Sequence, residues 1–218
     1  MAFRKNNPLG PVSGKIGETV SRIRYGKEVV YSKPASYHIS YSPSAVSGRS
    51  KFANAVKLAG LVNSVPELSL VWKIAKIKGT NSYQKIIKHN TKLVSDYGLT
   101  LKNIITPPLA LVEGHSITLD GNKIILEFKV DKSFPNPPLI LLTLISFQNE
   151  TQNEMFIVRS DELEKIDNGY LRGVLSLSAE ALDKTTGLNN AILLSAFLSA
   201  SGTICWSSTI PFELNLKP

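Results

Sequence analysis

Residues 116–130 read Ser-Ile-Thr-Leu-Asp-Gly-Asn-Lys-Ile-Ile-Leu-Glu-Phe-Lys-Val, and this stretch carries the strongest fold signal in the chain. Runs of alternating or continuous apolar residues flank Asp120-Gly121-Asn122 on both sides. An Asp-Gly pair between two such runs is a strong indication of a β-hairpin. We therefore predict two antiparallel strands, joined by a tight turn at Gly121.

Comparable runs continue to the C-terminus, at residues 139–148, 154–158, 171–177, 191–200 and 203–214. Residues 189–201 have the alanine and leucine content of a helix, but their strict alternation favours a strand. Asp161-Glu162-Leu163-Glu164 is assigned to a solvated connection, because it lacks calcium-loop spacing. Roughly seven strands with regularly spaced turn signals indicate an antiparallel β-sandwich.

The N-terminal part shows different patterns. Glycine and proline punctuate residues 8–34, leaving two short strands at 19–25 and 28–32 around Gly26-Lys27. Three helices follow: one starting at Ser42 and Pro43 and reaching about residue 63, one at 68–77, and one from Thr80 or Asn81 to about residue 96. The predicted fold is α+β, with a basic arm, β-hairpin and helices at 1–102 and a sandwich domain at 103–218.

Two features of the predicted helices concern the core. Phe52, Val56, Ala59 and Val62 fall on one face of the first helix, so we expect this stripe to be buried. Trp72 in the second helix is expected to be a core anchor, because aromatic side chains supply a large buried area.

The two parts of the chain differ in net charge. Residues 1–102 hold 17 Lys/Arg and 4 Asp/Glu, which gives +13, whereas residues 103–218 hold 8 and 13, which gives −5. Such asymmetry predicts that the first half attracts a polyanion or an acidic protein face. The candidate contacts are Arg22 and Arg24 on one strand face, with Tyr25 and Tyr31 available for stacking, and Lys85, Lys88 and Lys92 on one face of the third helix. A solvated charged face is the alternative for both groups.

Catalytic and metal-binding signatures are missing. Cys205 is the single cysteine, and His38, His89 and His115 lie in distant segments without metal-ligand spacing. There is no phosphate-binding loop and no nucleophile elbow. We therefore predict a non-enzymatic protein with no metal and no cofactor. The polar, basic N-terminus and the short apolar runs predict synthesis in the cytoplasm and no membrane partner.

Four stretches, taken in order, resemble one family. They are Gly14-Lys15-Ile16-Gly17 before a tyrosine-containing strand pair, Arg49-Ser50-Lys51-Phe52-Ala53, Asn81-Ser82-Tyr83 opening a helix that contains Asn90, and Ala196-Phe197-Leu198-Ser199-Ala200-Ser201-Gly202 before a final strand. This pattern resembles an uncharacterised protein family of Bacteroidetes and their mobile elements. The resemblance covers most of the chain, and residues 147–169 fit it less well. It implies a basic N-terminal region, an immunoglobulin-like sandwich, and no activity or catalytic residues.

These observations predict a structural or assembly protein of a phage particle or a phage-derived assembly. Its partners would be further copies of itself or other structural proteins, with nucleic acid as a possible partner of the basic half. It would move from the cytoplasm into the assembled particle. Two other functions remain open at this point: a nucleic-acid-binding accessory protein, and a surface sandwich that binds carbohydrate or protein.

Overall fold

A computed structural model describes residues 2–3, 13–24, 26–32, 39–108, 112–130, 134, 139–148, 153–160, 163–166, 169–178, 190–199 and 204–215. The chain forms two compact units, Met1–Tyr41 and Ser42–Pro218. The division therefore falls after Tyr41, whereas the change of sequence pattern placed it after residue 102. The physical reason lies in the helices, which share a core with the sandwich.

The first unit is a small antiparallel sheet. Its strands are β1 (Ala2–Phe3), β2 (Gly14–Ile16), β3 (Thr19–Arg24) and β4 (Lys27–Ser32), in the order β1-β4-β3-β2. The predicted hairpin is confirmed as β3 and β4, and Gly26 between them has a φ of 72°. Only glycine adopts such a φ without steric cost, which explains its place in this turn.

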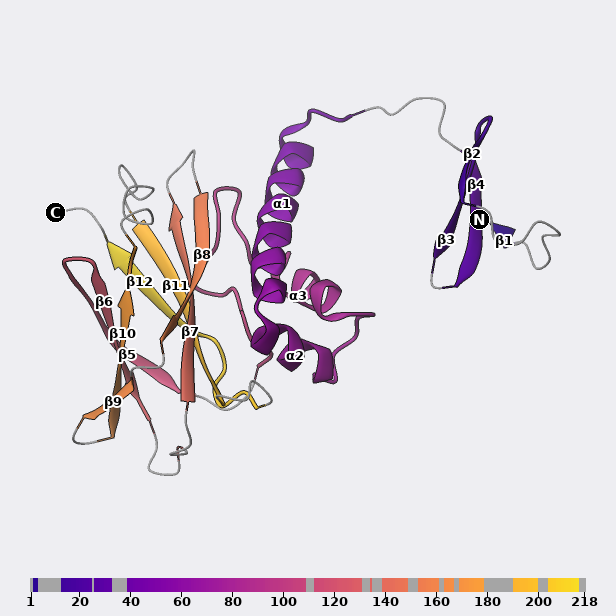
Figure 1. Cartoon of the computed structure of the whole chain (residues 1–218). Helices are drawn as coiled ribbons and strands as arrows, with labels where there is room; N and C mark the ends of the chain where they lie inside the picture. The colour runs from indigo at the N-terminus through magenta and orange to yellow at the C-terminus, as the bar shows by residue number, and fades with distance from the viewer. Residues whose placement is uncertain are drawn as a thin grey trace. The chain divides into compact units, whose positions relative to one another are not determined.

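The second unit contains two four-stranded antiparallel sheets that form the predicted sandwich (Figure 1). The outer sheet has the order β5-β6-β10-β9, with β5 Glu113–Asp120, β6 Lys123–Lys129, β9 Leu163–Ile166 and β10 Tyr170–Ser176. The central sheet has the order β12-β11-β7-β8, with β7 Leu139–Gln148, β8 Asn153–Ser160, β11 Asn190–Ser199 and β12 Ile210–Asn215. Leu163 and Glu164 belong to β9, whereas the sequence placed Asp161–Glu164 in a connection. Two of the four β9 residues are charged, which hides the strand pattern; Asp161 and Glu162 lie outside the described residues.

The central sheet is buried on both faces. Alternate residues of β7 and β11 enter two separate apolar cores, one shared with the helices and one shared with the outer sheet. Leu142 and Leu194 belong to the first core, and Leu141 and Leu193 belong to the second. This double burial explains why both strands are almost continuously apolar, as is typical of strands covered on two sides. The prediction of a strand rather than a helix at β11 is confirmed.

Three helices cover the free face of the central sheet (Figure 1). They are α1 (Pro43–Ser64), α2 (Pro66–Ile74) and α3 (Ser82–Asn90). The predicted caps are confirmed: the amide of Ala45 donates to Ser42 Oγ at 3.3 Å, and the amide of Gln84 donates to Asn81 Oδ1 at 2.9 Å. Within the described part of the chain, no helix is both long and apolar enough to cross a bilayer.

The apolar stripe predicted for α1 is partly wrong. Phe52 is 53 % exposed, whereas Leu58, which was not in the stripe, is fully buried beside Ala55, Ala59 and Val62. Two neighbouring stripes on this helix are apolar, and contact with α3 selects the one that begins at Ala55. Periodicity alone does not distinguish them.

Helix α3 ends at Asn90, six residues before its predicted end near residue 96. The side chain of Asn90 is fully buried and bonds with the following loop. Its Nδ2 donates to the carbonyl of Ile104 at 2.9 Å, and its Oδ1 accepts from the Ile104 amide at 2.9 Å. Trp72 is confirmed as a core anchor, since it is fully buried and its Nε1 donates to the carbonyl of Ile105 at 2.8 Å.

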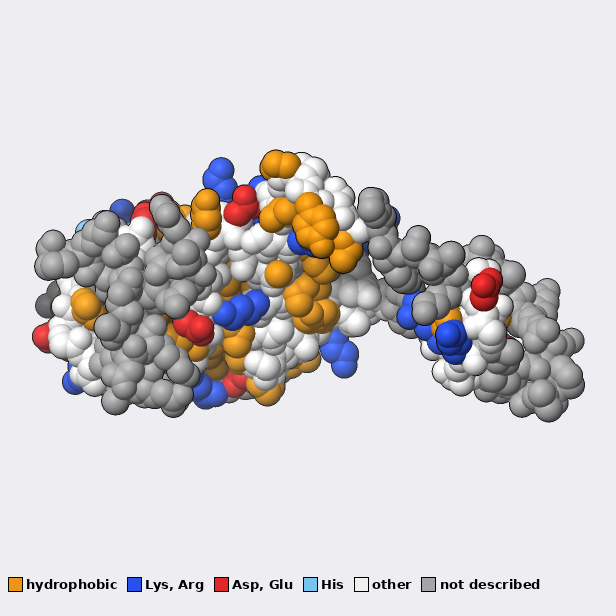
Figure 2. Space-filling model, turned by 90° about the horizontal axis from the view of Figure 1, so that it is seen from above, with side chains coloured by type: hydrophobic (Ala, Val, Ile, Leu, Met, Phe, Trp, Pro, Cys, Tyr) orange, Lys and Arg blue, Asp and Glu red, His pale blue; other side chains and the backbone are white. Residues whose placement is uncertain are grey.

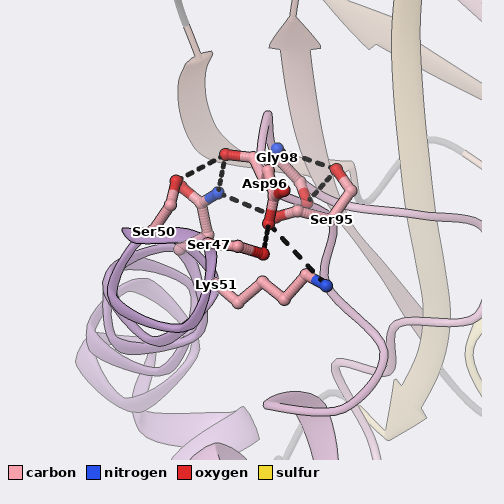
Figure 3. A network of polar contacts seen from close by, with 7 residues as sticks. Ser47, Ser50, Lys51, Ser95, Asp96 and Gly98 are labelled. Carbon is pink, nitrogen blue, oxygen red and sulfur yellow. Dashed lines mark hydrogen bonds and ion pairs between the residues drawn. The ribbon is translucent and has the colours of Figure 1, made fainter. Parts of the chain in front are cut away.

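A polar network holds the loop after α3 against α1 (Figure 3). Ser47 Oγ donates to Asp96 Oδ1 at 2.6 Å, and Ser50 Oγ donates to the Asp96 carbonyl at 2.6 Å. The ammonium of Lys51 lies 3.7 Å from the same carboxylate. On the other side of the loop, the Gly98 amide donates to Ser95 Oγ at 3.0 Å. The network fixes the loop relative to α1, so the two segments form one rigid part of the helical layer.

Candidate functional site

One face of the small sheet is basic. Val20 on β3 pairs with Lys15 on one side and Tyr31 on the other, so these three side chains share a face. Arg22 lies two residues after Val20 and belongs to the same face. The guanidinium carbon of Arg22 lies 5.4 Å from the centre of the Tyr31 ring, in the geometry of a cation–π contact. Lys27 joins this face, because it lies two residues before Val29, the register partner of Arg22.

The acidic side chain of the hairpin points the other way. Glu28 pairs with Ile23, which lies on the opposite face from Arg22. The hydroxyl of Ser21 donates to Glu28 Oε1 at 2.8 Å and holds the carboxylate there. Lys15, Arg22 and Lys27 are exposed, and the register keeps Glu28 away from them. Positive and negative charge are therefore separated across a sheet one residue thick.

Arg24 and Tyr25 are the two remaining candidates at this hairpin. Arg24 pairs with Lys27 at the turn end of β3, and its side chain is outside the described part of the chain. Tyr25 lies outside the described residues altogether. Of the two tyrosines proposed for stacking, the structure describes Tyr31, whose ring lies against Arg22.

Lys85 is not part of an exposed stripe, and this expectation was wrong. Its side chain is 7 % exposed, and its ammonium donates to the carbonyls of Trp72, Lys73 and Ala75 at 3.1, 3.0 and 2.7 Å. These carbonyls lie at the C-terminal end of α2 and at its C-cap Ala75, where helical acceptors lack an intrahelical donor. The Ala75 carbonyl also accepts from the Ile77 amide at 2.8 Å. The lysine caps α2, and its three donors are saturated by backbone rather than left open for a ligand.

Lys88 and Lys92 are exposed, as expected for binding residues. Lys88 lies on α3, but Lys92 lies beyond the end of the helix at Asn90. The predicted regular stripe of three lysines is therefore reduced to two exposed lysines on successive segments. The sequence could not show this, because the spacing rule assumes that the helix continues.

Three further exposed lysines were missed. They are Lys73 in the last turn of α2 and Lys76 and Lys78 in the connection that follows. A signal for them was present, since no Asp or Glu occurs between Glu67 and Asp96. Helical periodicity identifies residues that recur along one face of a helix. This surface is instead recognised by the absence of acidic residues from the segment.

The charge asymmetry is distributed over three segments. Residues 1–41 hold 7 Lys/Arg and 2 Asp/Glu (+5), residues 42–102 hold 10 and 2 (+8), and residues 103–218 hold 8 and 13 (−5). The first unit therefore carries +5 and the second unit carries +3. Positive charge is concentrated in the small sheet and in the helical layer of the second unit.

The outer sheet carries a separate polar cluster. Glu127 on β6 accepts from Ser116 Oγ at 2.8 Å and from Arg172 Nη2 at 3.0 Å. The Ser116 hydrogen bond and, after it, the Arg172 guanidinium lower the pKa of this carboxyl below its ordinary value of 4.5. Nearby, the rings of His115 and Tyr170 lie 4.7 Å apart. The lowered pKa makes this carboxylate a weaker base than an ordinary glutamate.

The Cys205 thiol and the His89 imidazole are two further groups that could react chemically. Burial raises the pKa of the Cys205 thiol to about 11, so the nucleophilic thiolate is scarce at neutral pH. The ring centre of His89 lies 5.8 Å from that of Trp72. Among the described residues, no group of three metal-ligating side chains comes together.

Comparison of the whole chain with protein-family models, with curated proteins and with solved structures found no match. The functional argument therefore rests on the surfaces described above.

Proposed function

We propose that the chain is a non-enzymatic assembly protein whose first unit, Met1–Tyr41, docks on an anionic neighbour. The observation that carries this proposal is the near absence of a core in that unit. Among its described side chains, Val29 is the one buried apolar residue, accompanied by the polar Ser21. A domain of about 40 residues usually needs disulfides, metals or a partner to remain folded.

The small sheet has the chemistry of an incomplete interface. A sheet needs a covered apolar face to be stable by itself, and its edge strands offer unpaired backbone groups. Ile23 is 48 % exposed on the face that carries Glu28, while the opposite face carries Lys15, Arg22 and Lys27. A neighbour with an acidic surface would complement the basic face and exclude water from the sheet.

Helix α1 presents a second surface suited to assembly. Val46 and Phe52 are 47 % and 53 % exposed on this helix. Figure 2 shows hydrophobic side chains gathered at the surface of the helical part of the second unit. Exposed apolar groups collected on one element are typical of protein contacts rather than of solvated helices.

We further propose that the sandwich is immunoglobulin-like. Numbered from its first strand, the outer sheet has the order 1-2-6-5 and the central sheet 8-7-3-4. This corresponds to the order ABED in one sheet and GFC with one added strand in the other. The particle that we favour for such a module is a phage particle or a phage-derived assembly, on the basis of the resemblance described above.

Particle size measured on the full chain tests the assembly role. We expect multi-angle light scattering and negative-stain electron microscopy to show ordered multimers at high protein concentration. Replacing Lys15, Arg22 and Lys27 together by Glu should dissociate them, because it inverts the charge of the docking face. The control is the same substitution at Lys123, Lys129 and Lys165, which are exposed on the other unit. A wild-type chain that stays strictly monomeric overturns the proposal.

A second candidate, a nucleic-acid-binding accessory protein, is favoured by the Arg22–Tyr31 contact. A basic strand face with an aromatic ring supplies both phosphate contacts and a stacking platform. In this case Arg22→Gln and Tyr31→Ala would each weaken binding of single-stranded DNA, and binding would fall steeply with salt. Affinity that does not change with salt concentration contradicts this candidate.

A further inference from the structure

Five exposed lysines lie on α2, on α3 and on the segments that follow these two helices, in the same part of the chain as the buried Lys85. We call them the lysine collar, and they are Lys73, Lys76, Lys78, Lys88 and Lys92. The three carbonyls that Lys85 contacts come from Trp72, Lys73 and Ala75, which brings the end of α2 against α3. Lys88 lies one helical turn beyond Lys85 on α3.

The connection between α2 and α3 packs closely against the aliphatic part of the Lys85 side chain at Gly79. A Cβ atom placed on Gly79 would lie 2.6 Å from Lys85 Cγ, closer than any side chain allows. The segment that carries Lys76 and Lys78 is therefore held against α3. Three positions of the collar, Lys73, Lys76 and Lys78, are fixed near Lys85 by these contacts.

Nothing described in the protein neutralises this surface. No Asp or Glu lies between Glu67 and Asp96 in the sequence, and no ion pair among the described residues involves a collar lysine. Lys85 adds a sixth positive charge beneath them, solvated only by carbonyl dipoles. Like charges so concentrated repel one another, and an extended polyanion would remove that repulsion.

We propose that the lysine collar binds the phosphate backbone of nucleic acid without sequence preference. Nucleic acid fits better than an acidic protein, because every unit of its backbone is negative, whereas an acidic protein face also carries lysines and arginines that an all-lysine surface repels. The segment from 68 to 95 has no arginine, which is the residue that reads guanine edges through a bidentate contact. Lysines act as point charges on phosphates, so contact with the backbone is the expected mode. This site is separate from the docking face of the first unit and does not depend on it.

The test is binding of a labelled double-stranded DNA of mixed sequence to the full chain, followed by fluorescence anisotropy over a range of salt. Each phosphate contact contributes about 0.9 to the slope of log affinity against log salt. Five contacts predict a fall in affinity on the order of 500-fold between about 50 and 200 mM salt. The variant K73Q/K76Q/K78Q should lower the slope by about 2.7, and K88Q/K92Q by about 1.8.

A matched control removes the same charge elsewhere. The variant K123Q/K129Q/K165Q changes three exposed lysines of the outer sheet and should leave the slope as in wild type. Equal losses in this control and in K73Q/K76Q/K78Q overturn the proposal, since net charge would then explain binding. It is also overturned if only substitutions at Lys15, Arg22 and Lys27 matter, or if polyglutamate competes as well as DNA at equal charge. Assembly is measured separately by light scattering, so the two proposals fail independently.

Discussion

The ammonium of Lys85 lies 2.7 Å from the carbonyl oxygen of Ala75, so a side chain of α3 terminates α2. The two other protons of this ammonium go to the carbonyls of Trp72 and Lys73. A positive charge at the C-terminal end of a helix also complements the helix dipole. One buried cation thus joins two helices and fixes the geometry of the surrounding lysine collar.

Replacing Lys85 by Met should destabilise the protein substantially. The methionine fills similar space but removes the donor from the carbonyls of Trp72 and Lys73, and each buried unsatisfied group costs about 1–3 kcal/mol. The Ala75 carbonyl keeps the hydrogen bond from the Ile77 amide. We expect a loss of at least about 2 kcal/mol in urea unfolding followed by circular dichroism. The exposed Lys88→Met is the control and should change stability by less than about 0.5 kcal/mol. Equal stability of the two variants would show that the Lys85 contacts contribute nothing.

Two Gly→Ala substitutions should act in opposite directions. A Cβ on Gly98 would lie 2.2 Å from Gln148 Oε1 and 2.8 Å from Asn153 Nδ2, so Gly98→Ala must displace two packed amides. We expect a loss of about 1–3 kcal/mol. Gly60 in α1 has nothing within 4 Å, so Gly60→Ala should add about 0.5–1 kcal/mol through helix propensity. Differential scanning calorimetry measures both, and a stabilised Gly98→Ala contradicts the packing described for the loop.

Thr143 and Ser195 form a buried hydroxyl pair between β7 and β11. Their oxygens lie 2.9 Å apart, and both residues are fully buried. Thr143→Val or Ser195→Ala alone leaves one hydroxyl unpaired and should cost about 1–3 kcal/mol. The double variant removes both polar groups and should be more stable than the sum of the singles predicts, by a margin that a double-mutant cycle measures. Strict additivity would mean that the hydroxyls do not depend on each other.

Glu127 should make stability depend on pH. Its pKa is lowered by Ser116, by Arg172 and, more weakly, by the charge of His115, and Arg172 also lies 3.8 Å from Glu164. A lowered pKa means that the stabilising contribution is complete above the ordinary value of 4.5 and is lost as the pH falls through the folded-state value. Glu127→Gln should therefore be less stable than wild type at neutral pH, and the difference should shrink well below 4.5. Urea midpoints at the two pH values provide the measurement; a difference that does not change with pH contradicts the assignment.

Local sequence signals predicted the secondary structure well where side-chain chemistry is decisive. The bounds of β7 were predicted as observed, the cap Ser42 was identified, and Asn81 is one of the two caps considered for α3. In each case the signal is contained in a few adjacent residues. The end of α3 could not be predicted in the same way, because it depends on contacts of Asn90 with Ile104, fourteen residues away.

The binding residues were predicted less completely. Lys85, Lys88 and Lys92 carry the same charge and follow helical spacings of three and four residues, yet one of them is buried and caps a helix. Burial of a lysine is decided by backbone acceptors that only the folded chain brings near. Lys73, Lys76 and Lys78 lie close to Lys85 because the chain turns back at Gly79. Spacing rules within one helix do not detect such a cluster.

The boundary between the two units lies after Tyr41 and not after residue 102, again because of contacts that only the folded chain makes. Charge and turn composition change near residue 102, but the helices share a core with β7 and β11. Arg159 of β8 also donates to Glu67 of α2 at 2.8 Å. Composition reports where the chain changes character, whereas a folding unit ends where contacts end.

The double-sided burial of the central sheet sets a rule for dissecting this protein. A fragment that begins after residue 102 would lack the helices and expose one continuous apolar face of the central sheet to water. This face consists of Ile140, Leu142, Leu144, Ile192, Leu194 and Leu198. We expect such a fragment to aggregate rather than fold, although it contains all eight strands of the sandwich. A fragment that begins after Tyr41, by contrast, retains every residue of both cores, and we expect it to fold and remain in solution.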